Sequence, residues 1–194
     1  MMLYIILAIF SVIATTFGGG FTPPRDQPDG IYHVPMRSTD LIAGRGNFQH
    51  PIYGDPILIR NATHFIPHGE LAPTIIYKRA APVPITQTEC MNVLLDRWHF
   101  NGALMNMAER CDSGEQIPSK GIMYSKYGSA IFYACQFSRG TQGCDSSELA
   151  YFVDWMDAQC GSLIGGFAYS NVWSKTYGMD SFATSFCNKL SLDD

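Results

Sequence analysis

The cysteines place the strongest constraint on the fold of this chain. All six follow residue 89, and an even set within a short stretch is typical of a disulfide-rich extracellular domain. We therefore expect three disulfides, whose pairing the sequence leaves open. A zinc site is the competing interpretation, but there is no CxxC pair and His99 is the only histidine in this part of the chain, so we expect no metal. The six are Cys90, Cys111, Cys135, Cys144, Cys160 and Cys187.

The first residues predict a secretory signal. Residues 1–14 form an apolar run without a charged side chain, and small residues follow it. The run is shorter than the roughly 20 residues that span a bilayer, so we expect no stable membrane span after the signal is removed. We assign residues 1–18 to a signal peptide and predict a secreted, extracellular protein.

Residues 19–79 read as a pro-segment that is largely irregular and poorly ordered. Residues 21–79 contain eight of the chain's 11 prolines and no cysteine, and their apolar residues follow neither a helical nor an alternating period. Short strands around Ile57 to Ile59 stay possible. Asn61 begins an Asn-Ala-Thr triplet, which is a glycosylation acceptor in a lumenal segment. We interpret four histidines of this region as solvated loop residues rather than metal ligands: His33, His50, His64 and His68.

A dibasic pair marks the next boundary. Lys78 and Arg79 lie in a Pro-containing stretch just ahead of the first cysteine, where a protease could bind the chain extended. We predict cleavage after Arg79 and a mature domain of residues 80–194. This domain has a formal net charge of −5, which would repel the phosphate backbone of a nucleic acid.

The clearest secondary structure in this domain is a helix over residues 145–161. Asp145 and Glu148 predict its N-terminal cap, and Gly161 suits its C-terminal cap. Tyr151 and Trp155 lie four residues apart on one flank, either packed under a second layer or exposed to a partner. The residues expected to face the core are Leu149, Phe152, Val153, Met156 and Cys160.

The remaining elements complete an α+β pattern. We predict an earlier helix from Thr86 to Gly102, with residues 103–110 able to resume it, and an antiparallel pair of strands over residues 121–127 and 129–137. A third strand over residues 163–169 contains two glycines that indicate a bulge. A short helical turn is expected at Phe182 to Phe186. The fold class is α+β, a small disulfide-linked sandwich of two main helices against an antiparallel sheet.

A row of aromatic residues is the main binding candidate. Tyr169, Trp173 and Tyr177 recur every four residues, with polar side chains between them. Exposed rings in this arrangement would suit a sugar or a protein partner, whereas buried rings would be part of the core. We favour burial for Trp173.

Catalytic signals are weak. His99 is the only histidine available as a base in the mature domain, and we interpret it as a surface or capping residue. Asp154 and Asp157 share one helical face, where a solvated acidic surface explains them better than glycosidic chemistry. No nucleotide-binding or hydrolase motif occurs, so we predict no catalytic residue and no cofactor.

The order of leader, pro-segment ending in Lys78-Arg79 and six-cysteine domain resembles small cysteine-rich fungal secreted proteins. This group includes plant-pathogen effectors, which are virulence factors, and killer-toxin-like α+β proteins. The resemblance also rests on YGSAIFYAC at 127–135, SSELAYFVDWMDAQCG at 146–161 and WSKTYG at 173–178. It implies a kexin-type processing protease and action on another organism or at the producer's own surface.

We therefore predict a non-enzymatic secreted effector or toxin-like protein whose partner is a host or target-cell protein or a cell-surface glycan. The first alternative is a cell-wall or carbohydrate-binding module, which requires Trp173 and Tyr177 to face solvent in one row. The second is a small secreted hydrolase, which requires His99, or Asp154 with Asp157, to line a cleft.

Overall fold

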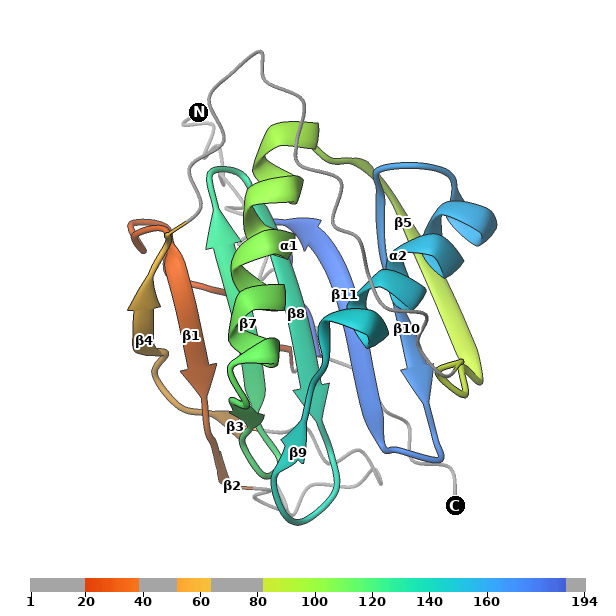
Figure 1. The fold of residues 1–194 in the computed structure, drawn as a ribbon. Coiled ribbons are helices and arrows are strands. Elements are labelled where there is room, and N and C mark those ends of the chain that lie inside the picture. The colour runs from red at the N-terminus through yellow and green to blue at the C-terminus, as the bar shows by residue number, and fades with distance from the viewer. Residues whose placement is uncertain (1–19, 39–51, 64–81, 188–194) are drawn as a thin grey trace, which may run out of the picture.

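A seven-stranded antiparallel sheet forms the centre of the molecule. The computed structural model describes residues 20–38, 52–63 and 82–187. The sheet has the strand order β4-β1-β7-β8-β11-β10-β5, so β4 and β5 are its two edges (Figure 1). Two further strand pairs, β2 with β3 and β6 with β9, lie outside it. The strands are β1 (Gly30–Val34), β2 (Met36–Ser38), β3 (Ile52–Tyr53), β4 (Ile57–Asn61), β5 (Gln87–Leu94), β6 (Gln116–Ile117), β7 (Ile122–Tyr127), β8 (Ala130–Gln136), β9 (Gln142–Gly143), β10 (Ile164–Ser170) and β11 (Lys175–Ser181).

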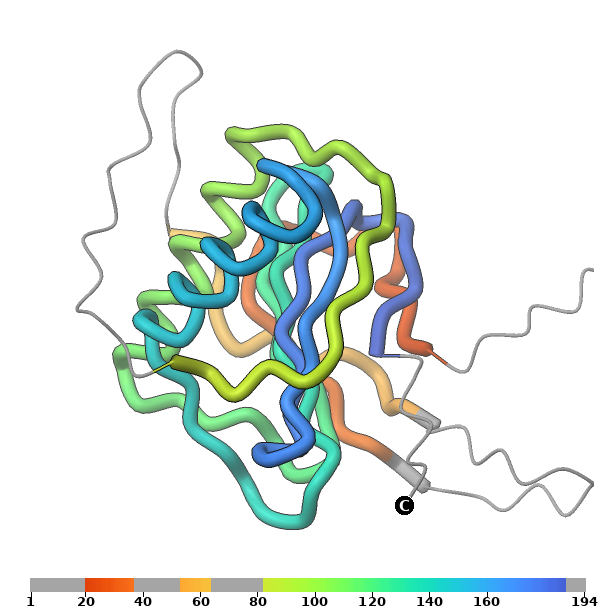
Figure 2. Tube along the Cα trace, turned by 90° about the vertical axis from the view of Figure 1, so that its right-hand side faces the viewer, coloured from red at the N-terminus to blue at the C-terminus, as the bar shows by residue number. Residues whose placement is uncertain are grey.

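Both helices, α1 (Arg97–Asp112) and α2 (Ser146–Cys160), cover the same face of this sheet (Figure 1). Side chains alternate across the strands, so each strand of the β7–β8 hairpin contributes to two apolar cores. Met123 and Phe132 pack under the helices, whereas Tyr124 and Tyr133 point to the other face. On that other face the chain near residue 21 lies beside the chain near residue 186 (Figure 2).

Three disulfides connect the elements. Cys90 on β5 pairs with Cys160 at the end of α2, Cys111 in α1 pairs with Cys144, and Cys135 on β8 pairs with Cys187. The prediction of three disulfides and an α+β fold is therefore confirmed. Each crosslink restricts the unfolded chain, which stabilises a small domain by about 4 kcal/mol per bridge in the loop-entropy treatment.

The elements with strong local signals form where they were predicted. α2 begins after the cap Asp145, whose side chain accepts a hydrogen bond from the amide of Ser147, and it ends at Gly161 with a φ of 96°. Its predicted core residues Leu149, Phe152 and Met156 are buried. The β7–β8 hairpin and β10 are also confirmed, and the register shift in β10 falls at its glycines.

The predicted helix from Thr86 to Gly102 is wrong up to residue 94 and correct from Arg97 onward, and the helix continues through residues 103–110 as expected. Residues 87–94 form β5, because they pair with β10, and the helix begins only after Asp96, whose carboxylate accepts bonds from the amides of Trp98 and His99. Gly102 does not end this helix. A Cβ at Gly102 would lie 2.5 Å from the ring of Tyr127, so the glycine lets α1 pack closely on β7.

The prediction that residues 19–79 are largely irregular needs correction for the described stretches 20–38 and 52–63, which contain four strands. β1 lies between β4 and β7 inside the central sheet, with five residue pairs to β7. The possible strand at Ile57 to Ile59 is present as β4. Because both faces of β1 are covered, its apolar residues do not alternate with polar ones, and the sequence lacks the usual signal of a half-buried strand. Residues 1–18 lie outside the described residues.

The C-terminal end differs from the predicted helical turn. Phe186 forms an isolated antiparallel bridge with Phe21, and the adjacent Cys187 is linked to Cys135. Phe182 lies in a turn directly after β11. The chain here is therefore held by one strand-like contact and one disulfide rather than by a helix.

Candidate functional site

The three aromatic residues of the predicted row do not share one surface. Tyr169 lies on β10 and Tyr177 on β11, with Trp173 in the turn between them. Tyr177 is opposite Ala168 in the strand pair, so Tyr177 and Tyr169 point to opposite faces of the sheet. Tyr169 is 8% exposed and Tyr177 is 2% exposed, whereas Trp173 is partly buried. A spacing of four aligns side chains on a helix but separates them in this hairpin.

Tyr177 belongs to a buried polar cluster with Lys175 and Glu148. The Lys175 ammonium donates to Glu148 Oε2 at 2.8 Å, to the carbonyl of Gly143 at 3.0 Å and to the Tyr177 hydroxyl at 3.0 Å. The Tyr177 hydroxyl in turn donates to Glu148. All three donors of the ammonium thus have partners, and the ring of Trp173 lies 5.1 Å from it.

This cluster fixes the first turn of α2 on the sheet. Burial raises the pKa of the Tyr177 hydroxyl well above its ordinary value, and the neighbouring Glu148 carboxylate adds to this effect. Glu148 was predicted as a capping residue, but its carboxylate turns inward to β11. A fully paired ion pair under a helix positions that helix and offers no free group for chemistry.

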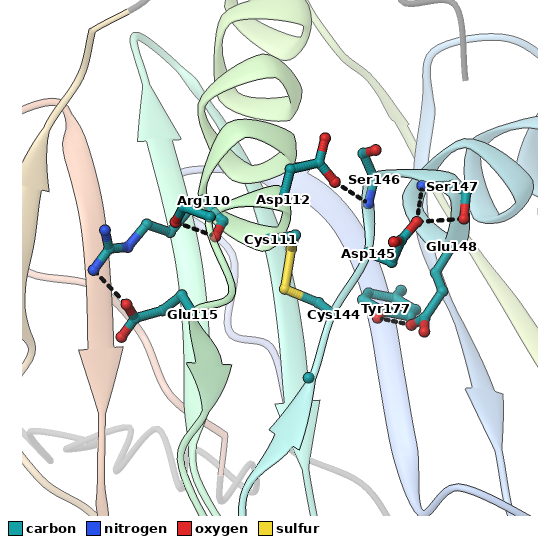
Figure 3. Close-up of a disulfide and its surroundings, with 12 residues drawn as sticks. Arg110, Cys111, Asp112, Glu115, Cys144, Asp145, Ser146, Ser147, Glu148 and Tyr177 are labelled. Atoms are coloured by element: carbon teal, nitrogen blue, oxygen red, sulfur yellow. Dashed lines mark hydrogen bonds and ion pairs between the residues drawn. A yellow bond between two sulfur atoms is a disulfide. The ribbon is translucent and has the colours of Figure 1, made fainter. Parts of the chain in front are cut away.

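Disulfides hold both ends of α2. Cys144 precedes the helix and is joined to Cys111 near the end of α1, as Figure 3 shows. Beside this bridge the Asp112 carboxylate accepts a hydrogen bond from the amide of Ser146 at 3.1 Å. At the other end, Cys160 is joined to Cys90 of β5. The helix that carries Tyr151 and Trp155 is therefore a rigid support.

Tyr151 and Trp155 form the aromatic pair that remains partly exposed. Their rings are stacked, with centroids 6.4 Å apart and planes 23° from parallel. The Trp155 indole nitrogen donates to the Thr88 hydroxyl of β5 at 2.9 Å, and its ring packs against the helix-side core. The pair thus lies where α2 meets the outer strand β5.

β5 gives this surface an open edge. It is eight residues long, and within the described residues no strand pairs with its outer side. Leu94 at its end is 73% exposed. An unpaired edge presents backbone amides and carbonyls that a further strand can bind. We take Tyr151, Trp155 and strand β5 together as the candidate binding surface and call it the α2–β5 surface.

His99 has the neighbours of a catalytic triad without its geometry. Its Nδ1 lies 2.9 Å from the Ser129 hydroxyl and 3.6 Å from the Asp96 carboxylate, and the amide of Ser129 donates to the same nitrogen at 3.3 Å. A triad requires the serine and the acid on different ring nitrogens. One nitrogen then accepts the serine proton while the N–H of the other stays hydrogen-bonded to the acid. Here serine and acid both face Nδ1. Asp96 also caps α1.

The second catalytic candidate, the pair of Asp154 and Asp157, is exposed to solvent. Asp154 and Asp157 both lie exposed on the outer side of α2, as the sequence interpretation expected. An exposed pair has neither the desolvation nor the enclosing cleft that acid–base catalysis on a sugar needs. The structure therefore gives the hydrolase alternative no site at His99 or at this pair.

A cluster that the sequence did not reveal surrounds His33. This histidine lies on β1 rather than in a solvated loop, with its Nε2 3.6 Å from the Glu115 carboxylate, which also pairs with Arg110. Burial lowers the pKa of His33, Glu115 opposes this shift, and Arg110 adds to it. Arg110 and Glu115 are five residues apart, and only the position of β1 in the sheet brings His33 to them. His50, His64 and His68 lie outside the described residues.

Asp180 is a second buried ionisable group that the sequence did not single out. It is fully buried on β11, where Oδ1 accepts bonds from the amide of Ser181 and the hydroxyl of Thr184, while Oδ2 has no partner. Burial raises the pKa of this carboxyl, and the two hydrogen bonds oppose the shift. The side chain faces the sheet surface that lacks the helices.

No family model, curated protein or solved structure matches this chain. Within the described ranges, no group of three potential metal ligands gathers at one point. In the same parts of the chain, neither helix has the length and apolar character needed to cross a bilayer.

Asn61 and the dibasic pair complete the predicted sites. Asn61 is exposed at the end of β4, where a glycan would not meet the core. The amide of Thr63, in the same triplet, donates to the side chain of Asn106 on α1. Lys78 and Arg79 lie outside the described residues, so cleavage there stays a prediction.

Proposed function

We propose that this protein is a secreted, non-enzymatic effector or toxin-like protein that binds a protein of another organism, or of the producer's own surface, through the α2–β5 surface. The observation that carries the proposal is the stacked, partly exposed pair of Tyr151 and Trp155 beside the open edge of β5. Three disulfides support an extracellular site of action, because such crosslinks persist in oxidising compartments.

The geometry favours a protein partner that binds in an extended conformation. An added strand would pair with the backbone of β5, and its side chains on the helix side would meet the two rings. Aromatic residues supply much contact area at small entropic cost. The disulfides at both ends of α2 keep these rings in place before binding, which reduces the ordering cost of the complex.

The charge of the surface favours a basic partner segment. Asp154 lies one residue before Trp155 and is exposed, and Asp157 is exposed on the next turn of α2. Residues 80–194 as a whole have a formal net charge of −5. Complementary charge would accelerate association at low salt. Ions would screen this attraction at high salt, so binding would be weaker there.

A carbohydrate-binding module receives less support. Flat glycan recognition needs neighbouring rings that face solvent together, but Tyr169 and Tyr177 are buried on opposite faces of the sheet. The hydrolase alternative lacks a site at His99 and at Asp154 with Asp157, as described above.

Binding of the purified secreted protein to candidate target cells tests the proposal. Tyr151→Ala removes the outer ring, and Leu94→Lys places a charge at the exposed end of β5. Each should weaken binding by about tenfold or more, the effect expected of a residue central to an interface. Ile57→Ser is the matched control, because Ile57 is 55% exposed on the opposite edge strand β4.

The control variant should bind like the native protein, and all three variants should keep the native thermal unfolding midpoint. Equal binding by Tyr151→Ala, Leu94→Lys and native protein would contradict the proposed surface. Retention on insoluble glycans, without a protein partner on the target cells, would instead favour the carbohydrate-binding alternative.

A further inference from the structure

The part of the chain before the dibasic pair is built into the central sheet without a covalent crosslink. β1 is inserted between β4 and β7, and residues 30–34 pair in order with residues 126–122. The first cysteine of the sequence is Cys90, so no disulfide can join residues 20–63 to the rest. Only the peptide chain through residues 64–81 makes this connection covalent.

Apolar burial on both faces of the sheet holds this segment in place. Ile31 packs under the helices, whereas Tyr32 and Val34 pack on the opposite side, and all three are at most 3% exposed. The ring of Phe21 lies 5.7 Å from that of Tyr124 and 5.6 Å from that of Phe186. The segment thus completes both cores rather than covering one surface.

Polar contacts fix the register of the segment. The Asp29 carboxylate accepts a hydrogen bond from the Lys126 ammonium at 2.5 Å and one from the amide of Gly128 at 3.1 Å. The Tyr124 hydroxyl donates to the side-chain carbonyl of Gln27. These contacts join residues almost a hundred positions apart in the sequence.

The far end of the segment is anchored on α1. Arg60 of β4 lies 3.1 Å from the Glu109 carboxylate, and the Thr63 hydroxyl donates to Glu109 at 2.9 Å. The amide of Thr63 donates to Asn106 at 2.8 Å. The segment is therefore held at both ends and along its strands. Its contacts are with β7, with α1 and with the chain at Phe186.

We propose that cleavage at Lys78-Arg79 does not release a pro-segment, and that the mature protein is a complex of two chains held by noncovalent contacts. The N-terminal chain donates β1 and β4 and is a permanent subunit. The C-terminal chain alone would expose the edge of β7 together with Tyr124 and Phe186. The proposal rests on the proposed cleavage at Lys78-Arg79. The noncovalent association of the two chains does not depend on which protease makes that cut.

The test uses a full-length secreted chain with a recognition sequence for a site-specific protease inserted after Arg79. The folded protein is purified, cut, and passed over a gel-filtration column under native conditions. Both fragments should elute together at the volume of the uncut protein and separate on a denaturing gel without reductant. Elution of the fragments in two peaks would overturn the proposal.

A chase experiment separates a permanent subunit from one that leaves slowly. The cut protein is incubated with an excess of isotope-labelled residues 20–79, and mass spectrometry follows exchange. Native cut protein should exchange negligibly over a day, whereas Asp29→Asn should exchange at least tenfold faster because the contact with Lys126 is weakened. Asp26→Asn, at an exposed position of the same segment, is the control. Complete exchange of native protein within minutes would contradict permanence.

A separate measurement tests whether the chain is cleaved at Lys78-Arg79 during secretion. The mass of the protein secreted by the producing cell shows whether Lys78-Arg79 is cut there. A single full-length species would contradict the dibasic cleavage but leave the gel-filtration result on the two-chain complex intact. Two chains that separate would contradict the complex but leave the cleavage intact.

Discussion

Phe21 and Phe186 join the two ends of the described fold through their backbones. The amide of Phe21 donates to the carbonyl of Phe186 at 2.8 Å, and the amide of Phe186 donates back at 3.0 Å. Their rings meet edge to face over Tyr124 and Tyr133. This bridge lies on the face of the sheet opposite the helices (Figure 2).

Replacement of Phe21 tests whether the N-terminal segment contributes to global stability. Phe21→Ala should lower the free energy of unfolding by about 3 kcal/mol, because it removes a buried ring and leaves a cavity. Denaturant titration followed by circular dichroism measures this loss. Ile57→Ala, at an exposed site, should change stability by less than about 0.5 kcal/mol. Equal stability of both variants would show that the segment is dispensable.

The Lys175–Glu148 pair gives a second prediction. Glu148→Ala should destabilise the fold by about 3–5 kcal/mol, because it leaves the Lys175 ammonium buried without its countercharge. The double variant Glu148→Leu with Lys175→Met should recover most of this loss, since no buried charge remains. Urea unfolding of both variants at pH 7 provides the comparison. A double variant less stable than Glu148→Ala would mean that the pair itself stabilises the fold.

His33 predicts a loss of stability in mild acid. Burial lowers its pKa below the ordinary value near 6.5, although Glu115 opposes the shift. The unfolded chain therefore takes up a proton before the folded one does. Stability should fall as the pH drops below about 6.5 and level off once the folded pKa is passed. His33→Asn should make the unfolding free energy less dependent on pH in this window, measured by urea titration at several pH values. An unchanged slope would exclude His33 as the cause.

Asp180 predicts a dependence of opposite sign. Burial raises the pKa of its carboxyl, so the folded state retains the proton above pH 3.8, where the unfolded state has lost it. This group therefore lowers stability as the pH rises through the folded pKa. Asp180→Asn keeps the acceptor for Ser181 and Thr184 but cannot ionise. The stability of the variant relative to native protein should be more favourable at pH 7 than at pH 3. A difference that does not change with pH would contradict this account.

Local signals in the sequence predicted part of the fold correctly. Asp145 and Gly161 bound α2 because a cap residue and a residue with positive φ act within one turn of helix. The β7–β8 hairpin was equally predictable, since its two strands are adjacent in the sequence. The candidate pair of Tyr151 and Trp155 followed from helical spacing alone.

Other features depend on partners distant in the sequence. Residues 87–94 have the cap-like pattern of a helix start, but pairing with β10 makes them a strand. The pairing of β10 with β11 places Tyr169 and Tyr177 on opposite faces of the sheet, so the predicted aromatic row is not one surface. A spacing of four residues has this meaning only after the secondary structure is known.

The sequence by itself determined the disulfide-rich character of the chain, helix α2 and the central hairpin, because these features depend on composition and on contacts a few residues apart. Only the tertiary structure decided that β1 and β4 belong to the sheet and that His33 meets Glu115. It also decided that α2 presents its aromatic pair beside the open edge of β5. Each of these features depends on contacts between residues that are far apart in the sequence, and no local sequence pattern predicts such contacts.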